Sequence, residues 1–598
     1  MTDYVAPLAE MRFVLDETVG LDAIAKLPGF EDATAELVEQ VLTEAGKFAA
    51  GVLAPLNRIG DEEGSRLENG AVVTPKGFRE AYHAFAEGGW NSVPFEAEWG
   101  GQGLPWSVAI AVQEMWSSAN MAFSLCPLLT QGAIEALQRH GSPEQKAAYL
   151  PKLISGEWTG TMNLTEPQAG SDVGALRTRA VKDGDRYRIT GQKIFITYGE
   201  QDFSENIVHL VLARTPNAPA GTKGISLFIV PKFLPNPDGS LGARNDLRCL
   251  SLEHKLGIKA SPTCVMAYGE NDGGAIGFLV GEEQRGMEYM FTMMNNARLS
   301  VGVEGLAVAE RALQQARSYA RERVQSRPVN TKSGETAAIV HHPDIRRMLM
   351  TMRALVEAMR ALTYLNAAAL DHAKRGTDEA ARNKALMRAE LLIPLSKAWS
   401  TDRGIDVASL NIQIHGGLGF IESTGAAQHL RDVRITPIYE GTNGIQAIDL
   451  VGRKLGRDQG AAMAALIDEM RADMASLNGD GDKDLAALGK AMAPALDDLA
   501  GATQWLMERL KSGLPQVLAG ATPYLDLAGT MVGAWQLARQ AQAARRRLAA
   551  GGEDGDYLSG KIATALFFAA HILPHTHGLA AAVTEGADST LRLAPDQI

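Results

Sequence analysis

The sequence predicts an α+β protein that is mainly helical. Apolar residues recur at helical spacing over residues 31–156 and again beyond Gly286. Between these regions, segments such as Arg186–Thr197 are rich in Ile, Val, Phe, Tyr and Thr and are bounded by turn residues, which is typical of strands. The C-terminal part of the chain is an alanine-rich segment with a helical pattern.

Five parts of the chain are predicted. Its 598 residues are more than one hydrophobic core usually serves. Short stretches containing Gly and Asp, at residues 456–460 and 478–484, mark the start of a last domain. We expect an N-terminal extension, an N-terminal helical domain, a central β-domain, a helical bundle and an additional C-terminal helical domain, in that order, at residues 1–34, 35–160, 161–284, 285–460 and 461–598.

Helix breaks, further strands and one buried helix face are predicted within these parts. The helices of the first domain are interrupted at Pro55, at Gly88-Gly89 and at a Gly-rich turn over residues 99–105. Further strands are expected at 207–214 and 224–230, and the strand pattern continues to about Val280. One face of a helix in the bundle is predicted from apolar residues spaced three or four apart: Leu306, Ala309, Leu313, Ala316 and Ala320.

The charge balance limits the classes of partner. A formal net charge of −12 and an isoelectric point near 5.6 argue against general attraction to nucleic acid or to an anionic membrane surface. A small acidic ligand would therefore need a local basic site.

The compartment is predicted from cysteines and apolar runs. Cys126, Cys249 and Cys264 are odd in number and lack the spacing of a metal site or a CxxC motif, which favours a reduced cytoplasm. The first ten residues lack a basic region followed by an apolar stretch, so no signal peptide is expected. The longest apolar runs, such as 562–570, are shorter than the roughly 20 residues that span a bilayer.

Two motifs carry possible chemistry. Glu440 is followed by Gly441 and Thr442, and this turn could bring a carboxylate and hydrogen-bond donors close to a flat ligand. An upstream segment, residues 162–178, offers hydroxyl and backbone NH groups in a Gly-containing turn. Taken alone, each motif is more often an ordinary loop or helix junction.

Together, in this order and separation, the two motifs resemble the acyl-CoA dehydrogenase family. The resemblance covers residues 31–457 and implies the family fold, with FAD bound without a covalent link. It implies that Glu440 is the catalytic base, which removes the α-proton of an acyl-CoA while the β-hydride passes to flavin N5. The product is the trans-2,3-enoyl-CoA. Some members carry the base just before an arginine of the bundle; here Ala297 precedes Arg298 and cannot serve.

The resemblance also implies which residues contact FAD. Phe195 stands where many members have a tryptophan that stacks on the flavin, and the following Thr197 offers a hydroxyl to N5. Arg323 and Gln413 match residues that reach the pyrophosphate of the neighbouring subunit. Downstream of Arg323, an inserted loop replaces the family's Thr-Phe-Gly, so the adenine contacts are not predicted. The full set of predicted cofactor contacts is Met162, Leu164, Thr165, Gly170, Ser171, Phe195, Thr197, Arg323, Gln413, Gly416, Gly417, Thr442 and Asn443.

Substrate and partners follow from the same resemblance. The predicted substrate contacts are Ser171, Arg298, Tyr439 and Gly441. A homodimer or larger homo-oligomer is expected, with an electron-transfer flavoprotein as acceptor. The enlarged layout is similar to a bacterial subgroup that includes 3-methylmercaptopropionyl-CoA dehydrogenases and medium to long-chain fatty acyl-CoA dehydrogenases, and we favour the first of these substrates.

Two other functions, and a metal site, are less favoured. An acyl-CoA oxidase would share the fold and the base, but would pass electrons to oxygen. A nucleic-acid-binding flavoprotein relative would need a basic C-terminal domain, whereas residues 461–598 hold 11 Lys and Arg against 16 Asp and Glu. A metal site is disfavoured because His415 has no ligand at helical spacing and His341 and His342 are adjacent.

Overall fold

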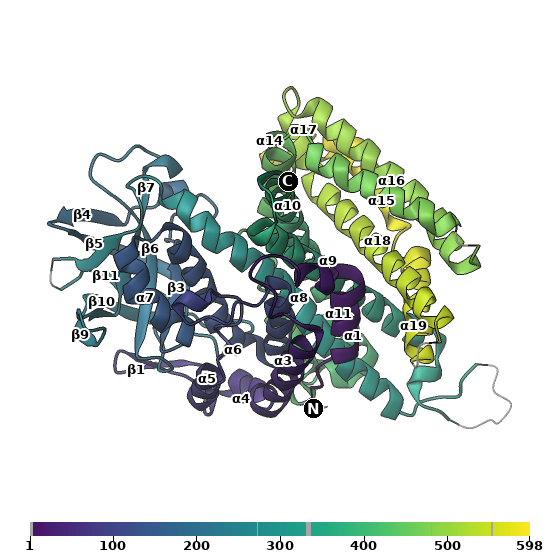
Figure 1. Ribbon diagram of the computed structural model, residues 1–598, viewed down its shortest axis with the longest axis horizontal. Helices are drawn as coiled ribbons and strands as arrows, with labels where there is room; N and C mark the ends of the chain where they lie inside the picture. The colour runs from purple at the N-terminus through teal and green to yellow at the C-terminus, as the bar shows by residue number, and fades with distance from the viewer. Residues whose placement is uncertain (1–3, 272, 330–335, 480, 552–553) are drawn as a thin grey trace. The chain divides into compact units, whose positions relative to one another are not determined.

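The computed structural model describes residues 4–271, 273–329, 336–479, 481–551 and 554–598 (Figure 1). The chain forms two compact units. The first comprises Met1–Gly46, Pro105–Ser118 and Val301–Ile598, and the second comprises Lys47–Leu104 and Ala119–Ser300. Helices predominate and the main sheet is confined to the second unit, so the predicted fold class is confirmed.

The second unit contains an eight-stranded sheet with the order β10-β11-β5-β12-β7-β6-β3, in which β4 also pairs with β5 and β6. Strand β3 runs parallel to β6, whereas β5, β7, β11 and β12 pair with their neighbours in antiparallel fashion. The strands are β3 Trp158–Asn163, β4 Arg179–Asp183, β5 Arg186–Thr197, β6 Asn206–Arg214, β7 Ile225–Pro231, β10 Leu247–Leu252, β11 Thr263–Tyr268 and β12 Ala275–Leu279.

A short hairpin interrupts the helical part of the second unit. Strands β1 (Arg66–Glu68) and β2 (Ala71–Val73) pair within the region that was predicted to be mostly helical. Asn69 and Gly70 connect them, both at positive φ, as an Asn-Gly hairpin turn requires. The other elements of this unit, or shared with the first, are η2 Ala49–Leu53, α4 Ala54–Glu63, α5 Phe78–Glu87, α6 Trp106–His140, α7 Pro143–Ser155, and the hairpin strands β8 Phe233–Pro235 and β9 Leu241–Arg244.

The first unit is a helical assembly. Its helix α8 (Gly286–Glu322) begins at the predicted residue, and all five residues of the predicted apolar face are at most 2% exposed. The other principal helices are α1 Leu8–Val14, η1 Leu15–Val19, α3 Ala35–Phe48, α9 Pro343–Arg375, α10 Glu379–Pro394, η7 Leu395–Trp399, α11 Ser400–His415, η8 Gly416–Phe420, α12 Ala426–Val433, α13 Asn443–Ile448, α15 Ala461–Gly479, α16 Lys483–Arg509, α18 Ala521–Ala549, α19 Gly555–His571 and α20 His575–Thr584.

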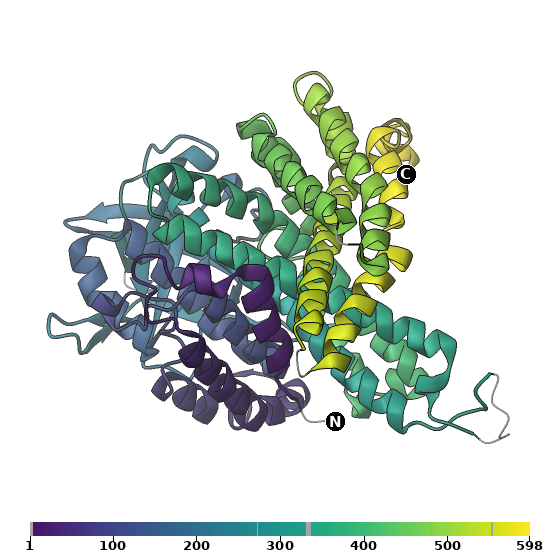
Figure 2. The same cartoon turned by 45° about the vertical axis from the view of Figure 1, so that its right-hand side comes forward.

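The C-terminal helices pack directly on the bundle. Both views show α15, α16 and α18 side by side (Figure 1 and Figure 2), and α18 also packs against α9 and η7. A Cβ atom added at Gly529 of α18 would lie 2.4 Å from the ring of Trp399, and the Trp399 Nε1 donates to Thr530 Oγ1 at 3.2 Å. This close approach explains the need for glycine at residue 529.

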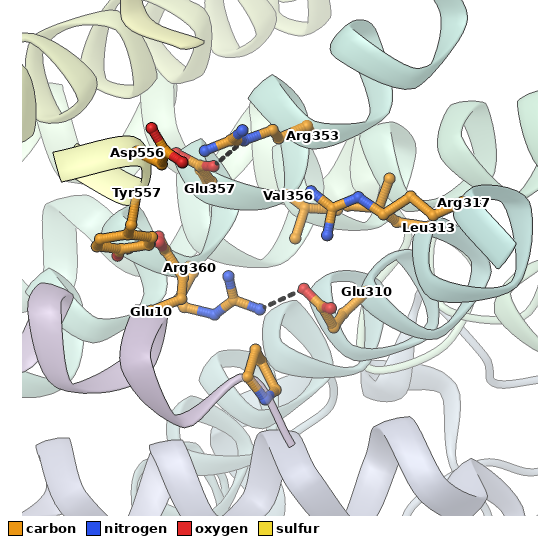
Figure 3. Close-up of a pocket in the computed structure, with 11 residues that line it drawn as sticks. Glu10, Glu310, Leu313, Arg317, Arg353, Val356, Glu357, Arg360, Asp556 and Tyr557 are labelled. Atoms are coloured by element: carbon orange, nitrogen blue, oxygen red, sulfur yellow. Dashed lines mark hydrogen bonds and ion pairs between the residues drawn. The ribbon is translucent and has the colours of Figure 1, made fainter. Parts of the chain in front are cut away.

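Buried ion pairs connect the N-terminal segment, the bundle and the C-terminal helices. Arg360 donates to Glu114 and Glu310 at 2.6 and 2.7 Å, while Lys561 donates to Glu10 and Glu357 at 2.6 and 2.7 Å. Figure 3 shows several of these side chains around a cavity of about 230 Å³. Because buried charges are stable only when paired, these contacts make the three segments depend on one another.

Within the described residues, no single helix is long and apolar enough to cross a membrane. Helices α19 and α20, which are bent relative to each other, together have the length and apolar composition of a broken membrane span.

Candidate active site

The predicted base lies on a short loop between α12 and α13. Glu440 has a φ of 58° and Gly441 a φ of 84°, so the backbone is left-handed at both residues. This conformation turns the chain sharply just before α13 begins. Thr442 then caps the helix, since its Oγ1 accepts from the backbone NH of Ile445 at 3.2 Å.

Polar contacts from η7 and α11 hold this loop in place. The buried Lys397 donates to the Gly441 carbonyl at 3.0 Å and to Asn443 Oδ1 at 2.8 Å. Asn443 Nδ2 donates to Asp402 Oδ1 at 2.7 Å and to Thr401 Oγ1 at 2.9 Å, and its backbone NH donates to Pro437. Asn443 thus supports the loop, and its predicted contact with the cofactor stays a prediction.

A second carboxyl lies beside the base. Glu304 of α8 is fully buried, and its Oε2 accepts a hydrogen bond from the Tyr439 hydroxyl. Burial and the nearby charge of Glu440 raise the pKa of Glu304 to about 8, although the Tyr439 hydrogen bond and Lys397 lower it. Burial, with Glu304 nearby, also raises the pKa of Tyr439 above its ordinary value.

Glu304 was not among the residues predicted from the sequence. The available signal was one carboxyl within the small and apolar run Leu299-Ser300-Val301-Gly302-Val303, which continues at Gly305. A carboxyl there is unusual because Glu is rarely fully buried without a partner.

The predicted pyrophosphate contacts of the first unit are open to solvent. Arg323 follows the end of α8 and is exposed, with Nη2 donating to Gln325 Oε1 at 3.2 Å. Gln413 is exposed on α11, and a Cβ atom added at Gly416 or Gly417 would meet nothing within 4 Å. Part of the inserted loop that follows Arg323, residues 330–335, lies outside the described residues.

In the second unit, the loop after β3 is organised around Glu166. Its carboxylate accepts from Lys193 Nζ at 2.9 Å, from Thr178 Oγ1 at 2.6 Å and from the Arg177 NH at 2.6 Å. Burial opposes ionisation, but Lys193 and these hydrogen bonds lower the pKa of Glu166 to about 2. Lys193 also donates to the Leu164 carbonyl at 2.9 Å, which joins the loop to β5.

This loop and β5 present groups that suit a flavin. Among the described residues, the hydroxyls of Thr165, Ser171 and Thr197 have no hydrogen-bond partner. Phe195 has a φ of 59° and is 58% exposed, which leaves a ring face free for stacking. The residues present therefore fit the ring of a flavin.

The other predicted residues of this unit are distributed around the same strands and on α8. Met162 is half-buried in β3, Leu164 is 8% exposed and Gly170 is exposed. Arg298 is buried, with its guanidinium 5.9 Å from the ring centre of Phe291.

Family models match almost the whole chain. The acyl-CoA dehydrogenase N-terminal, middle and C-terminal domains match residues 36–157, 161–271 and 284–455, and a C-terminal-like domain of acetyl-CoA dehydrogenase matches 466–594. The chain belongs to the acyl-CoA dehydrogenase family. This membership confirms the predicted enzyme class, an FAD-dependent oxidoreductase acting on the CH-CH group of an acyl-CoA.

Relatives in the acyl-CoA dehydrogenase family align over nearly their full length. A 3-methylmercaptopropionyl-CoA dehydrogenase of Ruegeria pomeroyi is 48% identical over 98% of this chain and 99% of its own. A broad-specificity linear acyl-CoA dehydrogenase, FadE5, of Mycobacterium tuberculosis is 35% identical over 96% of each chain.

Solved acyl-CoA dehydrogenase structures show the same fold. A Bacillus anthracis acyl-CoA dehydrogenase complexed with FAD has a TM-score of 0.74 and 21% identity, and covers 97% of this chain and 93% of its own. Caenorhabditis elegans ACDH-11 in complex with C11-CoA has a TM-score of 0.75 and 21% identity, and the match covers 95% of this chain and 92% of the ACDH-11 chain.

Among the residues that the structure describes, no group of three or more His, Cys, Asp or Glu side chains could hold a metal ion.

Proposed function

We propose that this acyl-CoA dehydrogenase uses Glu440 as the catalytic base and that its substrate is 3-methylmercaptopropionyl-CoA. The α-proton of the thioester passes to the Glu440 carboxylate, and the product is the trans-2,3-enoyl-CoA. FAD supplies the acceptor for the hydride that leaves the β-carbon. The weak acidity of the α-proton is overcome by hydrogen bonds to the thioester carbonyl that strengthen as negative charge develops there.

The arrangement around Glu440 carries the assignment of the base. Its loop is fixed from one side by Lys397, which donates to Gly441, and from the other by Tyr439, which donates to Glu304. A base held in this way keeps its position relative to a bound substrate, which is the main requirement for efficient proton transfer. Tyr439, Gly441, Ser171 and Arg298 remain the proposed substrate contacts.

The 48% identity to the Ruegeria pomeroyi enzyme over nearly the whole of both chains supports the substrate. The lower identity to the broad-specificity linear acyl-CoA dehydrogenase, 35%, makes a medium or long-chain fatty acyl-CoA the second candidate.

For FAD, the proposed contacts are those predicted from the sequence. The free hydroxyls of Thr165, Ser171 and Thr197 and the exposed ring of Phe195 support the isoalloxazine part of this set. Arg323, Gln413, Gly416 and Gly417 would serve the pyrophosphate, and their exposure leaves them accessible.

A homodimer is proposed for the assembly. Exposed apolar side chains adjoin the glycines of the proposed pyrophosphate loop: Leu418 is 48%, Phe420 85% and Ile421 50% exposed. A second copy would cover them and bring Arg323 and Gln413 to its cofactor. A cytoplasmic location, an electron-transfer flavoprotein as acceptor, and the five domain boundaries remain proposals.

Anaerobic bleaching of the bound flavin tests this function. The purified protein is mixed with butanoyl-, octanoyl-, palmitoyl- and 3-methylmercaptopropionyl-CoA in the absence of oxygen. Fastest bleaching by the methylthio thioester supports the proposal. Faster bleaching by octanoyl- or palmitoyl-CoA supports the fatty acyl alternative, and no bleaching by any thioester contradicts the proposed chemistry. Oxygen consumption without another acceptor would indicate an oxidase.

A further inference from the structure

Glu304 is a fully buried carboxyl beside the proposed base, and the proposed chemistry gives it no role. It lies on α8, whereas Glu440 lies on the loop before α13, 136 positions later in the sequence. The Tyr439 hydroxyl bridges them, because it belongs to the residue before Glu440 and donates to Glu304 Oε2. The other oxygen, Oε1, is buried and has no hydrogen-bond partner among the described residues.

These contacts favour a neutral Glu304. An isolated carboxylate is costly to bury, and a proton on Oε1 removes that cost without breaking the Tyr439 hydrogen bond at Oε2. The charged and titratable groups that act on Glu304 are Tyr439, Glu440 and Lys397. Of these, Lys397 donates to Gly441 and Asn443, and among the described residues no cation forms an ion pair with Glu304.

We infer that Glu304 is a positioning residue for the Glu440 carboxylate. Its carboxyl anchors the loop through the Tyr439 hydroxyl and, as a neutral acid, keeps the pair of carboxyls at a single negative charge. This inference rests on the proposed function, in which Glu440 is the base.

The charge of Glu304 should influence proton transfer. When Glu304 is neutral, the single charge of the pair is on Glu440, which is the form that can accept a proton. When Glu304 is ionised, two carboxylates repel each other, and the repulsion is relieved as Glu440 takes the α-proton. Ionisation of Glu304 should therefore accelerate flavin reduction at high pH.

The pH dependence of anaerobic flavin reduction tests this relationship. The rate constant is measured between pH 6 and 10 at saturating 3-methylmercaptopropionyl-CoA, or at saturating concentration of the best thioester of the panel. We expect the wild-type rate to rise roughly fivefold around pH 8, where Glu304 ionises. Glu304→Gln should lack this rise, because the amide does not ionise.

Two further variants, compared with Glu304→Gln, separate positioning from charge. Glu304→Ala and Tyr439→Phe should each lower the rate at pH 7 roughly tenfold or more, because both lose the anchor of the loop. Glu304→Gln should retain most of the rate at pH 7, since its amide oxygen still accepts from Tyr439. The apparent affinity for the thioester should change little in the two Glu304 variants, because Glu304 is not among the proposed substrate contacts. Flavin content and circular dichroism check folding.

A wild-type profile without a rise around pH 8, or a Glu304→Gln profile that keeps this rise, would overturn the inference. Wild-type rates in Glu304→Ala would do the same. Glu440→Gln distinguishes this failure from failure of the proposed function. If that variant bleaches normally, the assignment of the base is wrong; if it is inactive while the Glu304 variants resemble the wild type, only the role of Glu304 is wrong.

Discussion

Lys561 and Glu10 form a buried ion pair across 551 positions of the sequence, with Nζ to Oε1 at 2.6 Å. Lys561 belongs to α19 and Glu10 to α1, so the contact joins the two ends of the chain. The same ammonium donates to Glu357 of the bundle at 2.7 Å. Tyr557, one turn before Lys561, donates to the second oxygen of Glu10 at 2.6 Å. The C-terminal helices are therefore part of the folded core of the first unit.

Replacing Lys561 by methionine should destabilise the protein severely. The change leaves Glu10 without its cation and removes one of the two cations that pair with Glu357. Breaking a buried ion pair in this way costs about 3–5 kcal/mol. Urea unfolding followed by circular dichroism measures the loss. Lys490→Met is the matched control, because Lys490 is exposed on α16 and should change stability by no more than about 0.5 kcal/mol. Equal stability of the two variants would contradict the proposed importance of the network.

Glu440→Gln should retain FAD and still bind acyl-CoA, yet reduce its flavin more slowly by several orders of magnitude. The amide is close in shape to the carboxylate but cannot accept the proton. Stopped-flow absorbance under anaerobic conditions measures the rate. Glu379→Gln, an exposed substitution at the start of α10, should behave as the wild type. Rapid bleaching in Glu440→Gln would exclude this residue as the base.

Lys193→Met should reduce the content of FAD. Without the ammonium, Glu166 is buried without its cation, and the loop over residues 164–172 loses the side-chain hydrogen bonds that Lys193 of β5 donates to it. The ratio of flavin to protein absorbance after purification, and after addition of FAD, measures the effect. Lys223→Met, at an exposed position of the same unit, is the control. Full flavin content in Lys193→Met would show that the pair is dispensable for the cofactor.

Glu304 should also make stability depend on pH. Its pKa is raised in the folded protein to about 8 from an ordinary 4.5, so between these values the folded state holds a proton that the unfolded state has released. The contribution of Glu304 is therefore fully present below about pH 4.5 and is lost as the pH rises to about 8. Unfolding free energies at pH 5, 6.5 and 8 should fall more steeply in the wild type than in Glu304→Gln. Parallel curves would show that Glu304 ionises at its ordinary pKa.

Local patterns were sufficient to predict much of the fold. The bounds of β5, the start of α8 and the buried face of that helix follow from residue type and spacing alone. The β1–β2 hairpin was missed although Asn69-Gly70 is a strong turn signal, because its strands are only three residues long and lie among helices.

Contacts between distant segments could not be predicted in the same way. Glu440 was found through the resemblance of its loop, whereas the bond between Tyr439 and Glu304 joins residues 135 positions apart. Nothing in the pattern of either segment specifies its partner. The same holds for Lys397, whose support of the loop depends on how η7 packs against α13.

The left-handed backbone at Phe195 and Glu440 has a consequence for engineering. A residue other than glycine in this conformation lowers the stability of the folded protein by about 1–3 kcal/mol, so both positions destabilise the fold locally. Glycine at either position would relieve the cost, and selection for heat resistance alone would favour it. Such selection would remove the aromatic face or the carboxylate, and the more stable protein would lack a group to which we assign a role in the reaction.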